Sequence, residues 1–184
     1  AYIAEQLRAA GLRPGGPNGS WYQDVPLNQY TIIGAPDLSV TVGGRRQSLT
    51  QGEQIAVRAS MLNVDRVTIQ TAPLVFIGYG VRAPERNWDD FKGADLAGKV
   101  GIVLVNDPDF ETGQGDFGGK AMTYYGRWTY KYEEAARQGL AGILVVHETA
   151  PASYGWPPVK NSNTNTIFDS PRPNPAEVHP LLEG

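Results

Sequence analysis

The stretch from residue 100 to residue 147 constrains the fold of this chain more than any other. It starts with the apolar run VGIVLVNDPDF, continues through ETGQGDFGGKAMTYYG and RWTYKYEEAARQG, and ends with the apolar run LAGILVVH. Both apolar runs are short and β-branched, as is typical of strands buried on both faces. A helix of about a dozen residues is the usual connection between neighbouring parallel strands. The sequence therefore predicts a strand–helix–strand unit.

The helix of this unit has a predicted buried side and a predicted exposed side. The buried stripe consists of Trp128, Tyr132, Ala135 and Ala136, which recur at helical spacing. On the exposed side, Glu133 and Arg137 stand four residues apart, so we expect a favourable ion pair.

The residues from 21 to 80 carry mostly strand signals. Leu38, Val40 and Val42 alternate with polar residues, which places the three apolar side chains on one face, and Gly43-Gly44 fits a two-residue hairpin turn. Further strands are predicted at 21–27, 30–33, 54–60, 67–70 and 73–80. Short strands with frequent breakers favour a β-sandwich or open barrel. The expected fold is therefore mixed α/β and β-rich.

The two ends differ from this central region. Residues 1–12 predict a short helix that stops at Gly11, and residues 14–20 form a turn-rich linker. Residues 151–184 hold seven of the fourteen prolines, so we expect a connecting segment with at most one strand, near 166–168. The predicted division is a helix and linker over 1–20, a domain over 21–150 and a connection over 151–184.

Composition excludes several classes of function. A net charge of −3 and a pI near 5.4 argue against nucleic-acid binding, which requires a basic patch. The chain has no cysteine, which removes disulfides and thiolate zinc sites. No run approaches the roughly 18 apolar residues of a membrane span. We therefore expect neither a nucleic-acid partner nor a membrane span.

Two glycine-rich segments resemble phosphate-binding motifs only superficially. Residues 78–83 match G-x-G-x-x-A, but Pro84 follows almost at once and no helical periodicity begins there. Residues 113–120 (GQGDFGGK) lack the P-loop spacing and the Ser or Thr after the lysine. We expect a bend at a strand end in the first case and a mobile surface loop in the second.

Four oxygen-bearing side chains follow the first strand of the unit: Asn106, Asp107, Asp109 and Glu111. Such a cluster can hold calcium, but Pro108 stiffens its middle and the glycine of an EF-hand-type loop is missing. Solvated carboxylates in a turn are the expected arrangement, with calcium as the alternative.

Histidine is scarce, and this limits catalysis. Only His147 and His179 are present, with no H-E-x-x-H and no G-x-S-x-G. A hydrolase would need one of them to meet a serine and an acid through the tertiary fold. We expect no catalytic and no metal-binding residue in this chain, and a small hydrolase is the weakest of three readings.

Aromatic and basic residues gather at 122–132 (MTYYGRWTYKY), a composition typical of contact surfaces. Trp128 and Tyr132 are predicted to be core. Tyr124, Tyr125 and Arg127 are predicted to be available for contacts, together with the acidic Asp109 and Glu111 of the preceding loop.

The segments PLVFIGYGVRAPERNWDDFKGADLAGKVGIVLVNDPDF and YEEAARQGLAGILVVHE resemble the protease-associated (PA) domain, in the version inserted in secreted di-zinc aminopeptidases related to glutamate carboxypeptidase and the transferrin receptor. The resemblance covers about residues 73–148. The opening AEQLRAAGLRPGGPNGSWYQDVPL also resembles the helix and first strand that precede the insert, which would place residues 1–20 with the catalytic domain.

The resemblance implies a PA-like β-sandwich or open barrel, flanked by helices, that does not break bonds itself. In such enzymes the module lies beside the active-site cleft, where it shapes substrate access or contacts partners. Its implied partners are the catalytic domain and a peptide or protein substrate, and its implied location is extracytoplasmic. The two zinc ions are implied for the catalytic domain, with no cofactor in this chain. The alternative is a self-standing module that binds a peptide through a strand edge and the 110–128 loop.

Overall fold

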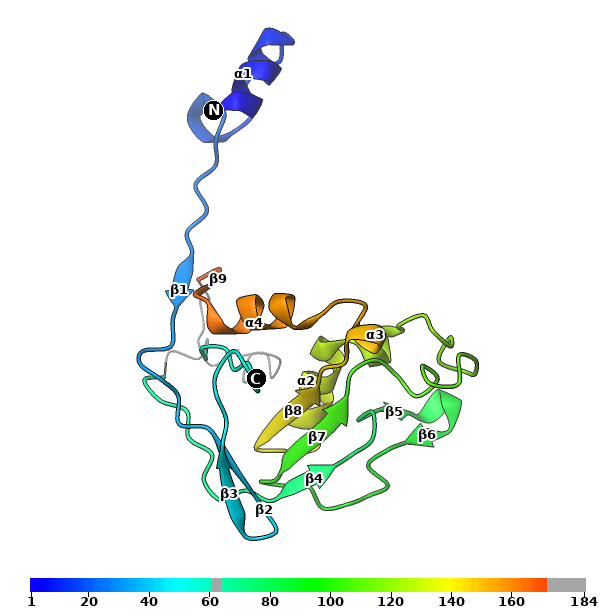
Figure 1. The fold of residues 1–184 in the computed structure, drawn as a ribbon. Coiled ribbons are helices and arrows are strands. Elements are labelled where there is room, and N and C mark those ends of the chain that lie inside the picture. Colours follow the sequence, from blue (N-terminus) through cyan, green and yellow to red (C-terminus); the bar gives the residue numbers. More distant parts are fainter. Residues whose placement is uncertain (61–63, 172–184) are drawn as a thin grey trace.

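The computed structural model describes residues 1–60 and 64–171, which form a mixed α/β structure of small sheets and helices with no closed barrel among them (Figure 1). The strands are β1 Asn28–Tyr30, β2 Ser39–Val42, β3 Arg45–Ser48, β4 Leu74–Phe76, β5 Arg82–Ala83, β6 Trp88–Asp89, β7 Val100–Leu104, β8 Gly142–Val146 and β9 Ile167–Asp169. The helices are α1 Tyr2–Ala9, α2 Trp128–Arg137, α3 Thr149–Ala152 and α4 Trp156–Thr164. Short 3₁₀ turns occur at Pro17–Gly19, Pro84–Arg86 and Tyr124–Gly126.

The predicted strand–helix–strand unit is confirmed. β4, β7 and β8 form a parallel three-stranded sheet in that order, and α2 connects β7 to β8. Side chains on the face that includes Val103 form the core with Phe91 and Leu96, while Leu140 and Ile143 pack against it. Because side chains alternate between faces, the neighbouring residues of each strand point to the other face.

The strand end at residues 77–80 forms a bend, as predicted. Gly78 and Gly80 have φ angles of 59° and 63°, and the next element is β5, not a helix. A Cβ at Gly80 would lie 2.7 Å from Val103 Cγ1, so this position requires glycine for close approach as well as for its backbone angle.

The hairpin around Gly43-Gly44 is also confirmed, with β2 and β3 antiparallel. Both glycines have positive φ, which a two-residue hairpin turn needs. Its predicted apolar face is packed only in part, since Leu38 and Val40 are half-buried while Val42 is 69% exposed. Strands predicted at 21–27, 54–60 and 67–70 are absent, because no neighbouring strand pairs with these segments; 61–63 lie outside the described residues.

The segment from 151, predicted as a connection with at most one strand, also contains a helix. α4 begins after Gly155, and Pro157 and Pro158 occupy its first turn, where proline has no hydrogen bond to lose. The predicted strand near 166–168 is present as β9, and it pairs with β1. The Trp156 indole also donates to the Gly52 carbonyl at 2.9 Å, so this segment packs on residues from the first third of the chain.

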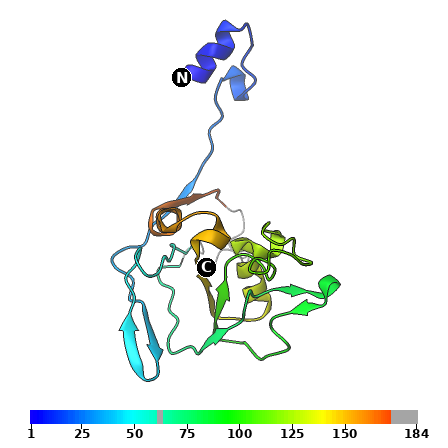
Figure 2. The same cartoon turned by 45° about the vertical axis from the view of Figure 1, so that its right-hand side comes forward.

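The helix predicted over 1–12 is observed as α1, which ends before Gly11 (φ 79°). α1 stands away from the rest of the molecule at the end of an extended segment, in both views (Figure 2). Its apolar side chains are open to solvent, since Tyr2 and Ile3 are each 72% exposed. No helix within the described residues is long and apolar enough to cross a bilayer.

Candidate interaction surface

The acidic turn after β7 is a structural anchor for the loop that follows. Asp107 is fully buried, and its Oδ2 accepts hydrogen bonds from the backbone N–H and the hydroxyl of Thr123, both at 2.8 Å. Asn106 Nδ2 donates to the Pro151 carbonyl at 2.8 Å. The expectation of solvated carboxylates is therefore wrong for Asp107, whose carboxylate closes the loop at its base.

Asp109 has a similar role within the loop. Its carboxylate accepts a hydrogen bond from the backbone N–H of Phe117, and a Cβ at Gly115 would collide with it. Glu111, by contrast, is exposed. Across residues 1–60 and 64–171, no group of three or more His, Asp or Glu side chains is placed to hold a metal ion. The three carboxylates of this loop are therefore not gathered into such a group.

The loop is anchored by a buried aromatic ring. Phe117 is 1% exposed and packs with Val81, Ala83 and Tyr130. Its ring meets Tyr125 edge-on at a centroid distance of 5.7 Å, and the Arg86 guanidinium lies 4.7 Å from its centroid. The free surface loop predicted for 113–120 is instead tied to the protein body through this side chain.

Tyr124, Tyr125 and Arg127, which we call the junction surface, lie together where this loop meets α2. Tyr124 is 52% exposed and Arg127 is exposed, whereas Tyr125 is half-buried beside Phe117. The rings of Tyr124 and Tyr125 are 6.4 Å apart. The structure thus brings the three predicted contact residues together, while Asp109 braces the loop from inside.

Carboxylates hold the two tyrosine hydroxyls of the junction surface. Tyr124 Oη donates to Glu133 Oε2 at 2.8 Å, and Tyr125 Oη donates to Glu85 Oε1 at 2.7 Å. These hydrogen bonds raise the pKa of both tyrosines, and the Tyr125 bond lowers the pKa of Glu85. Both rings are therefore oriented before any partner binds, which lowers the entropic cost of binding.

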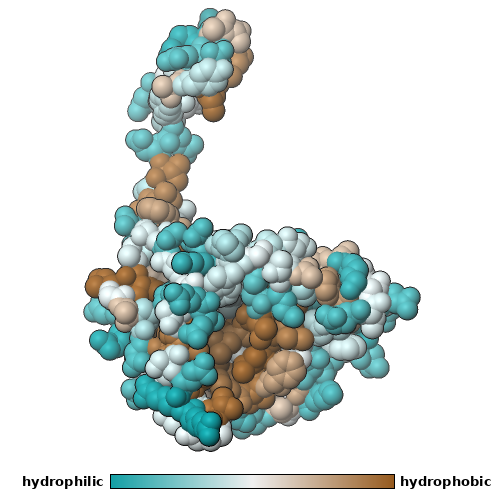
Figure 3. All heavy atoms as spheres, viewed as in Figure 1, coloured by the Kyte–Doolittle hydropathy of each residue, from teal (hydrophilic) through white to brown (hydrophobic). Residues whose placement is uncertain are grey.

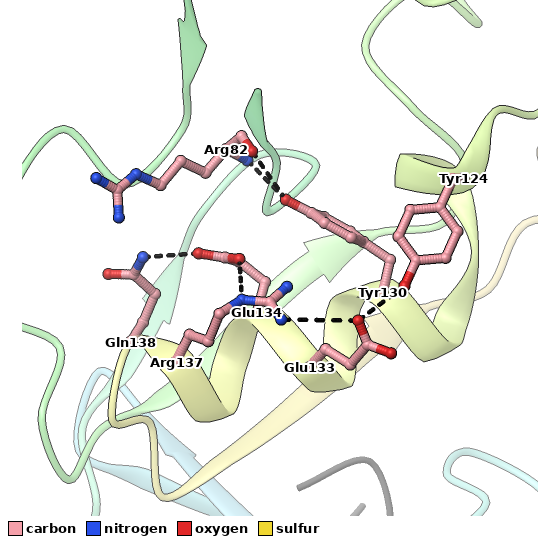
Figure 4. Close-up of polar contacts among 7 residues, drawn as sticks. All are labelled: Arg82, Tyr124, Tyr130, Glu133, Glu134, Arg137 and Gln138. Atoms are coloured by element: carbon pink, nitrogen blue, oxygen red, sulfur yellow. Dashed lines mark hydrogen bonds and ion pairs between the residues drawn. The ribbon is translucent and has the colours of Figure 1, made fainter. Parts of the chain in front are cut away.

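The side of α2 that faces the protein differs from the prediction. Ala136 is exposed, Trp128 and Tyr132 are half-buried, and the buried residues are Tyr130, Lys131, Glu134 and Ala135. Glu134 accepts hydrogen bonds from Arg137 Nε at 2.7 Å and from Gln138 Nε2 at 2.8 Å (Figure 4). The predicted Glu133–Arg137 pair is present at a longer 3.7 Å. No apolar periodicity could have indicated two buried charged residues.

Lys131 is the residue that sequence reasoning missed most clearly. It is fully buried, and its Nζ donates to the carbonyls of Tyr79, Asn106 and Tyr125 at 2.6, 2.9 and 3.4 Å. One ammonium thereby joins the bend after β4, the turn after β7 and the junction surface. All three of its N–H donors are used, so Lys131 is a cross-link and not a free nucleophile.

Tyr130 links α2 to β5 through its hydroxyl. The hydroxyl accepts from the Arg82 N–H at 3.0 Å and donates to the Arg82 carbonyl at 3.2 Å (Figure 4). Burial raises the pKa of Tyr130 to about 12.

Replacing Tyr130 with Phe should lower the free energy of unfolding by about 1–2 kcal/mol, because both Arg82 backbone groups lose a buried partner. Urea unfolding measures the loss. Tyr124→Phe is the matched control, since its hydroxyl bond lies at the exposed surface and its loss should cost less than about 0.5 kcal/mol. Equal losses in the two variants would show that the Arg82 bridge is not stabilising.

His147, which follows β8, is enclosed by aromatic rings. It stacks on Tyr154 at 5.4 Å, and Trp156 and Trp128 lie at 6.0 and 6.3 Å. Among residues 1–60 and 64–171, neither imidazole nitrogen has a hydrogen-bond partner, so no serine there pairs with His147. His179, the other histidine considered, lies outside the described residues.

Comparison with known proteins adds no further information. No family model, no curated protein and no solved structure matches this chain.

Proposed function

We propose that this chain is a non-catalytic PA-like domain of a di-zinc aminopeptidase, which controls substrate access or contacts partners from a position beside the catalytic domain. The proposal rests on the resemblance over residues 73–148 together with one structural observation. This observation is that Tyr124 and Arg127 stand exposed on a loop held from beneath by Phe117 and Lys131.

The chemistry of the junction surface suits contact with a peptide better than bond cleavage. Its tyrosines offer flat apolar rings with polar tips, and Arg127 offers hydrogen-bond donors, which is the composition found at protein contact sites. Two buried charged groups near this surface already make hydrogen bonds, although Asp107 Oδ1 has no partner among the described residues. Lys131 donates to three carbonyls, and Asp107 accepts two hydrogen bonds from Thr123.

The proposed access role is tested in the whole enzyme. Tyr124→Ala and Arg127→Ala, introduced together, should raise KM for a peptide several-fold while leaving hydrolysis of a small aminoacyl-anilide unchanged, because only the peptide is long enough to reach the junction surface. Tyr22→Ala is the matched control, since Tyr22 is 59% exposed and lies far along the chain from the junction surface. Unchanged KM for peptides would contradict an access role.

The purified chain itself provides a second test. The proposal expects no bound zinc by elemental analysis and no cleavage of aminoacyl-anilides by this chain, with both present in the whole enzyme. Turnover by the chain that disappears in His147→Ala would instead establish the hydrolase reading. The two zinc ions and the extracytoplasmic location belong to the proposed whole enzyme.

A self-standing peptide-binding module is the second candidate. It is favoured by the outer edges of β4 and β8, since within the described part of the chain each of these strands pairs on one side only, with β7. An extended peptide can add to such an edge through backbone hydrogen bonds. Measurable peptide affinity of the isolated chain, weakened by proline within β8, would favour this candidate over the access domain.

A further inference from the structure

One face of the parallel sheet is apolar and open. The helix-covered face carries Val103 and its neighbours, whereas the opposite face carries Leu74, Phe76, Ile102, Leu104, Leu144 and Val146. Phe76 is 63% exposed, Leu74 38% and Val146 39%. Figure 3 shows this open sheet face as a continuous apolar area over β4, β7 and β8.

An open face of this kind is unusual, because parallel sheets are almost always covered on both sides. The register aligns Phe76, Ile102 and Leu144 in one row across the three strands, so the apolar side chains are contiguous. The lower end of this face is covered, since Val100 is 7% exposed and the Ile69 side chain would lie 2.9 Å from a Cβ at the neighbouring Gly142. Ile102, Leu104 and Leu144 are half-buried. The covering layer that a parallel sheet needs is normally a helix.

The apolar side chains of helix α1 are uncovered in the same way as the open sheet face. Ile3 and Leu7 lie on one side of α1, and with Tyr2 and Leu12 they expose 38% to 72% of their surface. α1 lies at the opposite end of the molecule from the open sheet face (Figures 1 and 2). The connection from Ser20 to Leu27 contains no helix or strand, so it is an extended arm that carries α1 away from its own sheet.

The areas involved indicate how many such contacts a stable complex needs. Full contact between α1 and the open sheet face would cover roughly 400 Å² on each partner, given that an aromatic side chain alone buries about 150–250 Å². One contact would therefore total roughly 800 Å², which is the size of a weak association, whereas two reciprocal contacts total roughly 1,600 Å², the standard size of a stable interface.

We propose that α1 of one copy of this chain packs on the open sheet face of a second copy, and that the second copy returns the same contact, giving a symmetric arm-exchanged dimer. Exchange of an identical element is a common route to a twofold dimer, because the same contact forms twice. This proposal does not rest on the access role proposed above; it gives α1 a partner other than the catalytic domain, beside which the resemblance places residues 1–20.

The absence of cysteine allows a direct cross-linking test on the full chain. Chains carrying Leu7→Cys are mixed with chains carrying Phe76→Cys and oxidised, and we expect a mixed disulfide dimer. The matched control is Phe168→Cys, since Phe168 lies in β9 and is 61% exposed, close to the value for Phe76. A mixed disulfide with Phe76→Cys no more abundant than with Phe168→Cys would overturn the proposal.

The doubly substituted chain, with cysteine at 7 and 76, distinguishes a second copy from the same copy. A cross-linked dimer at micromolar concentration supports exchange, and a cross-linked monomer that persists on dilution overturns it by placing α1 on its own sheet.

Sedimentation supplies an independent measurement: Phe76→Glu should weaken dimer formation at least tenfold, while Phe168→Glu should leave it unchanged. A monomeric wild-type chain at high concentration would also overturn the proposal.

Discussion

Lys131→Met is expected to lower the free energy of unfolding by about 3–5 kcal/mol, the range for removing one partner from a buried charged network. Methionine fills a similar volume but donates no hydrogen bond. The carbonyls of Tyr79, Asn106 and Tyr125 would therefore lose a donor where the ammonium is now buried. The buried Asp107 carboxylate would also lose its nearby positive charge. Urea unfolding at pH 7 measures the loss.

The pH dependence of stability measures what the burial of the Lys131 ammonium costs. Burial lowers the pKa of Lys131 to about 8 from its ordinary 10.5. Between these values the folded chain has released a proton that the unfolded chain still holds, so stability contributed at this site rises with pH. We expect the wild type to gain about 2 kcal/mol relative to Lys131→Met between pH 8 and pH 10. A constant difference over this range would contradict the assigned burial cost.

The second large effect is expected for Phe117→Ala, at about 3–5 kcal/mol of lost stability. Phe117 is almost fully enclosed by Val81, Ala83 and Tyr130, so alanine would leave a cavity the size of a phenyl ring. Tyr125 and Arg86 would also lose the ring on which they rest. We therefore expect the junction surface to lose its order together with the stability of the fold.

Phe110→Ala is the matched control, because Phe110 belongs to the same loop but is only half-buried, with its ring against Lys120. Its loss should cost about 1 kcal/mol. Thermal unfolding compares the two variants, and near-ultraviolet circular dichroism reports the packing of the surrounding tyrosines. If both variants lost the same stability, Phe117 would not be the anchor of the loop.

Local sequence patterns predicted the elements whose partners lie nearby in the chain. The unit from β7 to β8 and the hairpin at Gly43-Gly44 formed as expected, because their periodicity and turn residues act over short distances. Strands predicted at 21–27, 54–60 and 67–70 had the right residue types but found no partner to complete a ladder. α4 was not predicted, because the many prolines of this segment indicated a connection. Two of them, Pro157 and Pro158, instead lie in the first turn of the helix.

The candidate site, like the fold, was predicted from the sequence only in part. Residue type indicated that Tyr124, Tyr125 and Arg127 would gather at the junction of loop and helix, and these three do lie together. It could not indicate that Asp109 would turn inward, or that Lys131 would be buried. These outcomes depend on backbone groups that folding brings within reach, and carbonyls and amides leave no signature in a sequence.

The sequence by itself determined the parallel strand–helix–strand unit from 100 to 147, since alternation, helical periodicity and glycine placement are properties of neighbouring residues. Only the tertiary structure decided which charges are buried and which apolar surfaces stay open. Lys131 became a cross-link because the carbonyls of Tyr79 and Asn106 converge on it. Phe76 remained exposed because the cover that Ile69 gives the second face of the sheet lies at the other end of the strands, near Gly142 and Val100. Both results depend on contacts between residues distant in the chain, which local patterns do not encode.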